Sequence, residues 1–96
     1  MPFVARHRES GQVWTGMLVN SYKLPYYGTK YWDFEEDATA GLPVFLEEQG
    51  ADTPEAWQLM EVEEAQLKRY NVKLKNSPLL LLYTDEAGTA DIRKRE

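Results

Sequence analysis

Alternating apolar and polar positions at the start of the chain predict a β-hairpin. Residues 3–8 and 13–20 have the composition of strands, and residues 9–12 between them have the composition of a turn. Apolar side chains fall on both faces of the second strand, as at the neighbouring positions Val13 and Trp14. We therefore expect this strand to be central in its sheet or covered on both sides.

A connection, a third strand and a helix follow in the pattern. Pro25 and Gly28 mark residues 21–28 as a connection, and the aromatic residues of segment 29–34 favour a strand. Apolar residues then recur at positions 38, 42, 45 and 46, the spacing of a helical stripe, with Asp37 as a candidate N-cap and Gly50 as a stop. A proline inside a helix costs about 3 kcal/mol. We therefore expect the regular helix to begin at position 42, with Pro43 in its first turn.

Residues 56–62 fit two structures. The sequence Thr53-Pro54-Glu55 is typical of a helix start, but the residues after it alternate like a strand. We favour the strand, because it completes a strand–helix–strand unit with the aromatic strand before it. Residues 63–75 predict a second helix, with acidic residues in its first turn and basic residues near its end. Residues 79–84 and 89–92 predict a final hairpin.

These elements predict one globular domain over residues 1–92 and a charged, flexible tail over residues 93–96. The fold class that we expect is α+β: a mainly antiparallel sheet of four to five strands with about two helices packed on it. A chain of 96 residues fits one domain, and 43% hydrophobic residues are enough for one modest core.

Composition also bears on the compartment. The chain contains no cysteine, so it has neither a disulfide framework nor a thiolate site. Its first residues lack the long apolar stretch of a signal peptide. The longest apolar run, residues 79–83, is too short for a bilayer, which a helix spans in about 20 residues. We expect a cytoplasmic protein without membrane contact.

The net charge of −5 is unevenly distributed along the chain. Between Tyr31 and Leu67 there is no Lys or Arg, whereas eleven carboxylates fall in this stretch. Such a surface would attract a basic partner or imitate nucleic-acid phosphates, unless the acids serve only helix starts and solvated faces. Nucleic-acid binding itself is not expected, because the sequence pI is about 4.9. Six of the acids form a candidate acidic patch: Asp33, Glu35, Glu36, Asp37, Glu47 and Glu48.

No residue pattern indicates catalysis, a metal site or a cofactor. His7 is the single histidine, and without cysteine it cannot build a usual metal site. The acids at positions 33, 35 and 37 share the spacing of the first calcium-loop ligands, but Ala38 stands where that loop needs Gly and Val44 where it needs Glu. An enzymatic or small-ligand-binding domain, with a pocket between helices and sheet, is one alternative to a non-enzymatic protein.

An aromatic segment around a Pro/Gly loop is the strongest candidate for a binding surface. Tyr and Trp are enriched at interface hot spots because they combine a large apolar area with a polar group. The alternative is that part of this segment, Tyr31 and Trp32, belongs to the core of a strand. The candidate binding residues are Tyr22, Tyr26, Tyr27, Tyr31 and Trp32.

The leucine-rich segment 79–83 is a second candidate contact. Its side chains alternate between the two faces of a sheet, so either both faces are covered or one row contacts a second copy. The second case is a homodimer formed through the strand from Leu79 to Tyr83. The function that we favour is a non-enzymatic protein-interaction or regulatory module that binds a protein partner or itself. A further alternative is an acidic nucleic-acid mimic that inhibits a DNA- or RNA-binding protein.

Overall fold

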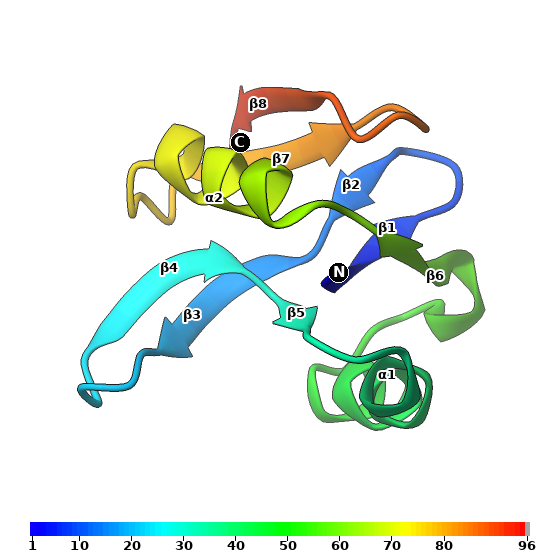
Figure 1. The fold of residues 1–96 in the computed structure, drawn as a ribbon. Coiled ribbons are helices and arrows are strands. Elements are labelled where there is room, and N and C mark those ends of the chain that lie inside the picture. Colours follow the sequence, from blue (N-terminus) through cyan, green and yellow to red (C-terminus); the bar gives the residue numbers. More distant parts are fainter. Residues whose placement is uncertain (96) are drawn as a thin grey trace.

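The structure, a computed structural model, describes residues 1–95 and consists of antiparallel strands with two helices packed on them (Figure 1). This arrangement confirms the α+β class, with one sheet of six strands and a second sheet of two. Neither helix in this part of the chain has the length and apolar content that crossing a membrane requires.

The N-terminal third forms one strand and a long, bent hairpin beside it. β1 (Phe3–His7) pairs with β2 (Gln12–Val13) and, near its start, with β5 (Tyr31–Trp32). One residue separates β2 from β3 (Thr15–Val19), and one separates β4 (Pro25–Thr29) from β5. β3 and β4 pair with each other, and their hairpin projects from the body of the molecule in Figure 1. The predicted first hairpin, residues 3–8 with residues 13–20, is confirmed for β1 and β2, whereas residues 15–19 pair with β4 instead.

The second half of the chain extends the sheet on both sides. β6 (Trp57–Glu61) pairs with β1 over the full length of that strand. β7 (Leu80–Thr84) lies between β2 and β8 (Ala90–Lys94). The predicted strand near residues 56–62 and the final hairpin are therefore confirmed. A one-turn 3-10 helix, η1 (Pro54–Ala56), explains the helix-like start before β6.

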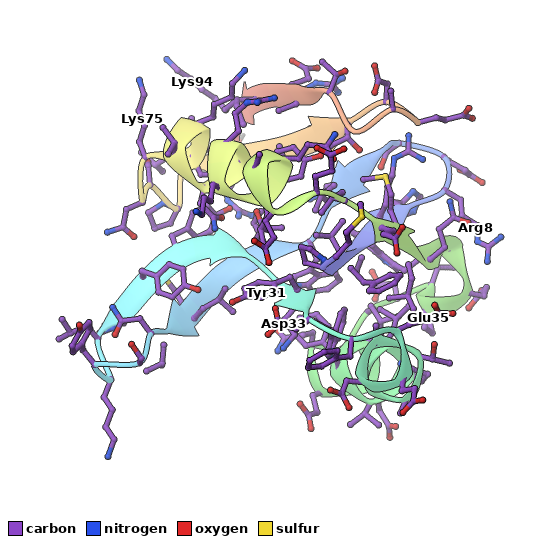
Figure 2. The ribbon with its side chains drawn as sticks, in the orientation of Figure 1. Arg8, Tyr31, Asp33, Glu35, Lys75 and Lys94 are labelled. Atoms are coloured by element: carbon purple, nitrogen blue, oxygen red, sulfur yellow. The ribbon has the colours of Figure 1, made fainter. Side chains whose placement is uncertain are left out.

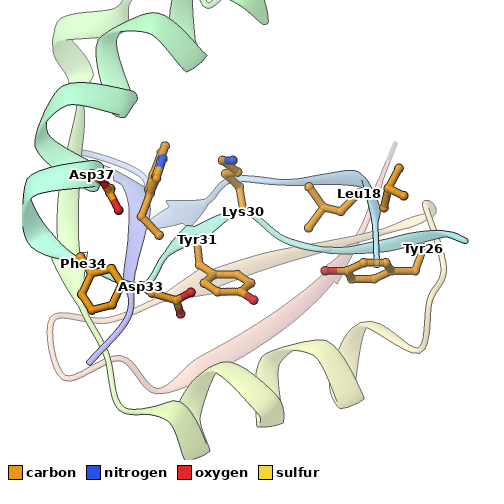
Figure 3. Close-up of a pocket in the computed structure, with 9 residues that line it drawn as sticks. Leu18, Tyr26, Lys30, Tyr31, Asp33, Phe34 and Asp37 are labelled. Atoms are coloured by element: carbon orange, nitrogen blue, oxygen red, sulfur yellow. The ribbon is translucent and has the colours of Figure 1, made fainter. Parts of the chain in front are cut away.

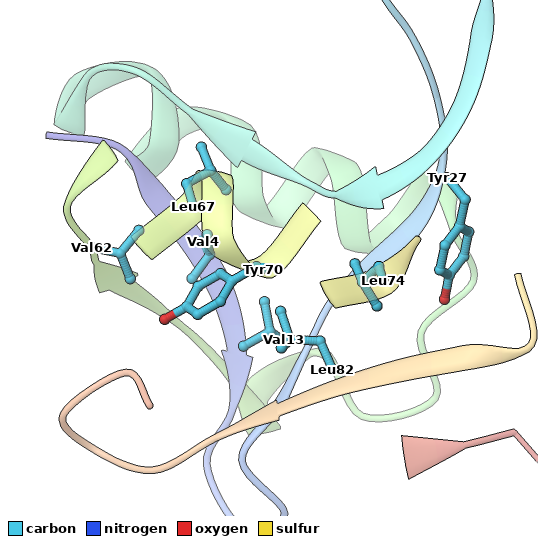
Figure 4. Packing of buried hydrophobic residues seen from close by; sticks show 8 residues of the cluster. All are labelled: Val4, Val13, Tyr27, Val62, Leu67, Tyr70, Leu74 and Leu82. Carbon is cyan, nitrogen blue, oxygen red and sulfur yellow. The ribbon is translucent and has the colours of Figure 1, made fainter. Parts of the chain in front are cut away.

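α2 (Glu64–Leu74) covers one face of the sheet and confirms the second predicted helix. Its apolar residues recur every three to four positions and face the strands, as the 3.6-residue period of a helix requires. The carboxylate of Glu63 and the amide of Gln66 cap its first turn reciprocally. The buried cluster beneath it (Figure 4) comprises Val4, Val13, Tyr27, Val62, Leu67, Tyr70, Leu74 and Leu82.

α1 (Glu35–Glu48) covers the opposite face through aromatic rings. His7 lies three positions after Val4 on β1, so the two side chains point to opposite faces. The ring of Phe45 lies 5.4 Å from the ring of Trp14, measured between centroids. Trp57 in turn lies 4.8 Å from Trp14 and 5.2 Å from His7. The strand that begins at β2 is thus covered on both sides at its start, as predicted, but β3 projects into solvent.

The prediction of a connection over residues 21–28 is wrong for β4. Pro25 occupies the first position of the strand, where a missing N–H costs little. Gly28 lies inside the strand because the ring of Tyr26 covers it: a Cβ added there would lie 2.8 Å from Tyr26 Cε2. β4 therefore tolerates Pro25 because it is the first residue of the strand, and Gly28 because the ring of Tyr26 covers it.

The prediction that the first helix begins at position 42 is also wrong, since α1 begins seven residues earlier. Phe34 is the N-cap, and Asp37 lies in the first turn among three acids that complement the positive helix end. Pro43 lies inside the helix. Pro43 and Thr39, whose carbonyl loses its N–H partner, are both exposed, so water can satisfy that carbonyl.

The predicted stop at Gly50 is confirmed. This residue has a φ of 68°, a left-handed conformation that glycine adopts without cost. Its N–H donates to the Glu47 carbonyl at 3.1 Å, and the Ala51 N–H donates to the Leu46 carbonyl at 3.0 Å. These two bonds form a Schellman motif, which satisfies carbonyls at the end of α1.

The last strand ends later than residue 92, where the sequence predicts the end of the domain. β8 includes Arg93 and Lys94, which we had expected to belong to a tail, and the Arg95 N–H donates to the Leu79 carbonyl. Glu96 lies outside the described residues. β7 is paired on both edges and Leu82 is buried in the core, whereas Leu79, just before the strand, is 69% exposed. A homodimer through the leucine side chains of this segment stays a prediction.

Candidate functional site

The predicted aromatic residues do not form one surface, because Tyr27 belongs to the core. Only 4% of its surface is exposed. Its hydroxyl donates to the Leu80 carbonyl at 2.6 Å and lies 2.7 Å from Thr15 Oγ1. Tyr27 therefore ties the projecting hairpin to β7 and is removed from the candidate surface.

Trp32 is shared between the core and the surface. Its ring meets Phe45 edge to face at 5.9 Å, and Lys30 Nζ lies 5.0 Å from the centre of the Trp32 ring. α1 crosses close to this ring at Gly41, where an added Cβ would lie 2.6 Å from Trp32 Nε1. The indole thus anchors α1 on β5 and holds a cation over its face.

Tyr26 and Tyr31 line an open groove of about 510 Å³ between the hairpin and the start of α1 (Figure 3). Burial raises the pKa of the Tyr26 hydroxyl, and the nearby Tyr31 adds to this effect. Both tyrosines and Asp33 also line a neighbouring groove of about 260 Å³ beside α2. The other residues of the larger groove are Leu18, Val19, Lys30, Trp32, Asp33, Phe34 and Asp37.

The hairpin also exposes apolar side chains that sequence reasoning did not select. Met17, Val19 and Leu24 are 59%, 67% and 59% exposed, and the predicted Tyr22 is 82% exposed. Asn20 orders the loop: its Oδ1 accepts the N–H groups of Tyr22 at 2.9 Å and Leu24 at 3.0 Å. The alternation of β3 places Met17 and Val19 on one face of the strand. The sequence does not show that this face is exposed, because that depends on how far the hairpin projects.

The candidate acidic patch is divided along α1. Glu35, Glu36 and Asp37 lie in the first turn, whereas Glu47 and Glu48 lie in the last. Thirteen residues of helix separate the ends by about 20 Å. Asp33 and Asp37 instead join the larger groove beside Lys30. The structure therefore gives an acidic helix rather than one compact cluster.

Several charged side chains at the surface lie far from charges of opposite sign. Figure 2 shows Lys75 and Lys94 at the end formed by α2 and β8, and Glu35 at the end formed by α1. Within residues 1–95 the one ion pair shorter than 4.0 Å joins Arg93 to Asp91 at 3.0 Å. No carboxylate of the acidic patch has a basic partner at that distance in this part of the chain.

His7 acts in the turn between β1 and β2. Its Nδ1 accepts the N–H groups of Glu9 at 3.3 Å and Ser10 at 3.2 Å, and its ring packs edge-on against Trp57. Across residues 1–95 no three His, Asp or Glu side chains gather closely enough to hold a metal ion.

The hairpin and its groove combine exposed apolar side chains, tyrosine hydroxyls and charges of both signs. An open groove of this kind can receive side chains of another protein, with hydrogen bonds at its rim. Comparison of the chain with models of protein families, with curated proteins and with solved structures finds no match.

Proposed function

We propose that this protein is a non-enzymatic protein-interaction module whose contact surface is the β3–β4 hairpin and the larger groove beside it. One observation carries the proposal: four large apolar side chains, each more than half exposed, lie on a single projecting hairpin. Gathered apolar exposure of this kind marks interaction sites on soluble domains, whereas singly scattered apolar residues need no explanation. The four residues are Met17, Val19, Tyr22 and Leu24.

The groove supports a protein partner over a small ligand. Small-molecule sites are concave and enclose most of the ligand surface, but this groove is open along the hairpin (Figure 3). Tyr26 and Tyr31 supply rigid aromatic area with a polar tip, and Lys30 and Asp33 supply a charged rim. An apolar centre with a polar rim is the usual composition of a protein interface.

Affinity capture from the native, nuclease-treated lysate tests this function with matched variants. The double variant Tyr22→Ser/Leu24→Ser removes apolar side chains from the hairpin loop. Val72→Lys is the control, because Val72 is 73% exposed on α2 and lines none of the three grooves near the hairpin. We expect the double variant to lose a partner that the wild type and the control retain through a high-salt wash. Identical captured proteins for the wild type and the double variant would refute the proposed surface.

Nucleic-acid mimicry has less support. A mimic needs carboxylates that converge on one face in the manner of phosphates. The acids of α1 lie at its two ends, and Asp37 belongs to the aromatic groove. We therefore assign the contact to the hairpin rather than to the acidic helix.

A further inference from the structure

We infer that the free edge of β3 binds an extended segment of the partner by strand addition, an inference that rests on the proposed function. In this mode main-chain hydrogen bonds supply affinity and side-chain grooves supply specificity. The partner segment is apolar at alternate positions and neutral or acidic at the others. Four observations lead to this assignment: an unpaired ladder, an unguarded edge, an adjoining groove and the local charge.

The unpaired ladder follows from the register of the hairpin. The N–H groups of Tyr27 and Thr29 turn away from β3 and donate to Asn76 Oδ1 at 2.6 Å and Asn71 Oδ1 at 2.9 Å. Met17 stands opposite Tyr27. Opposite residues in an antiparallel pair exchange both main-chain bonds or neither. The N–H and C=O groups of Met17 therefore point away from β4 and have no partner in residues 1–95.

The same reasoning applies to its neighbours along β3. Thr15 stands opposite Thr29, and Val19 stands opposite Pro25, which has no N–H to donate. Donors and acceptors therefore recur at every second residue along the free edge of β3, the spacing that an added strand matches.

The edge of β3 is also unguarded, unlike the edges of β4, β6 and β8. Proteins usually protect edge strands with charges, prolines or covering side chains. Asparagine side chains cover the edge of β4, β8 carries Asp91, Arg93 and Lys94, and β6 ends with Glu61. The sequence of β3 is Thr-Gly-Met-Leu-Val, without charge or proline.

A groove of about 310 Å³ adjoins this edge. It opens where the chain leaves β7, because Val13 still pairs with Leu82 but Thr15 has no partner on β7. At Gly16 no atom lies within 4 Å of an added Cβ, so the face of β3 that borders this groove is open. A side chain of an added strand can enter here against apolar and amide groups. The lining residues are Gln12, Trp14, Thr15, Gly16, Gln49, Trp57, Leu81 and Arg95.

The charges near β3 favour a segment of another protein over a second copy of this chain as the added strand. Residues 10–32 contain no carboxylate but contain Lys23 and Lys30, and Arg95 lines the groove. A neutral or acidic segment meets no like charge on this edge. In a second copy paired antiparallel through β3, the loop with Lys23 would lie toward Arg95 of the first copy. That arrangement brings cations together at both ends of the pair.

The test uses a phage-displayed library of random nine-residue peptides, selected against the full chain. We expect selected peptides to alternate apolar residues with neutral or acidic ones. Adding such a peptide should slow hydrogen exchange of the Thr15, Met17 and Val19 amides at least tenfold. Replacing the Met17 amide with an ester removes one donor and keeps the side chain, so it should weaken binding about fivefold. The Val72→Lys control should bind normally.

Three outcomes would overturn strand addition. They are a library that yields no binder, a bound peptide that leaves the three amides exchanging at their original rate, and amides that are already protected in a dimer without peptide. The last outcome assigns the edge to a second copy. If the lysate partner is lost with Tyr22→Ser/Leu24→Ser but binds the ester protein normally, strand addition fails and the proposed function stands. If neither change affects capture, both fail.

Discussion

Gly41 permits the closest approach between α1 and the sheet. Its absent side chain leaves room for the edge of the Trp32 indole, since a Cβ there would lie 2.6 Å from Nε1 and 3.2 Å from Cε2. In a solvated helix interior, glycine is about 1 kcal/mol less favourable than alanine. The close contact with the indole therefore reverses the usual benefit of alanine at this position.

Gly41→Ala should destabilise the protein by about 1–3 kcal/mol, the usual cost of overpacking. Trp32 also lines the candidate groove, so its fluorescence should change as well. Urea unfolding followed by tryptophan emission measures both effects. Thr39→Ala, on the exposed side of the same helix, is the matched control and should be neutral or slightly stabilising. A Gly41→Ala variant more stable than wild type would contradict the close approach.

Tyr70 fixes the turn between β7 and β8 to α2. The residue is 1% exposed, and its hydroxyl donates to the Gly88 carbonyl at 2.5 Å. Gln66 supports the same turn by donating to the Ala87 carbonyl at 3.2 Å. Burial raises the pKa of the Tyr70 hydroxyl, with a further increase from Asp85 and a decrease from Arg69.

Tyr70→Phe should lower the free energy of unfolding by about 1–3 kcal/mol, because a buried carbonyl loses its donor. The raised pKa makes the Tyr70 contribution complete below the unfolded value of about 10 and lost as pH rises through the folded value. The stability of the wild type should therefore fall more steeply than that of the variant on the alkaline side. Urea unfolding between pH 7 and pH 11 measures this difference, and parallel profiles would rule out the contribution.

At the scale of elements, the sequence predicts best where periodicity is local. The first and last hairpins and β6 follow their alternation, and α2 follows its helical period. β4 was missed because Pro25 and Gly28 resemble breaks, while the hydrogen bonds that Asn71 and Asn76 accept from this strand are tertiary features. The start of α1 was missed because Pro43 was given its full cost, although the helix exposes that residue.

The candidate site, like the elements, could be predicted only in part from the sequence. Tyr26, Tyr31 and Trp32 of the predicted aromatic surface line the larger groove, but Tyr27, next to Tyr26 on β4, is buried. Phe34 was not selected, although it is 68% exposed and lines the groove. Composition identifies the residue types that can bind, whereas the twist and projection of the hairpin decide which of them face solvent.

Pro43→Ala should raise the free energy of unfolding by about 1–3 kcal/mol. The substitution restores an N–H that can donate to the Thr39 carbonyl in a helix that already continues through this position. Thermal and urea unfolding followed by circular dichroism measure the gain. A loss of stability would mean that α1 needs the fixed φ angle of the proline. Val44→Ala, at the adjacent exposed position, serves as the control.

At the scale of the whole molecule, one sheet separates two unlike cores. The α1 side contains all three tryptophans, Trp14, Trp32 and Trp57, whereas the α2 side is built from aliphatic residues and two tyrosines. β1 contributes to both sides, with Val4 facing α2 and His7 facing the aromatic rings. Tryptophan emission therefore reports on the core beside α1. A substitution in the core beside α2 then tests whether the two cores unfold together.

Leu74→Ala should destabilise both cores equally, although Leu74 lies only on the α2 side. The residue is fully buried, and truncating a buried leucine costs about 2–5 kcal/mol. Because β1 is common to both cores, loss of one removes the surface on which the other packs, and we expect a single cooperative transition. The urea midpoints from tryptophan emission and from far-UV circular dichroism should coincide in the wild type and shift together in the variant. If the emission midpoint stays in place while the dichroism midpoint falls, α1 and its aromatic rings form an independent unit, and residues 1–92 do not unfold as one domain.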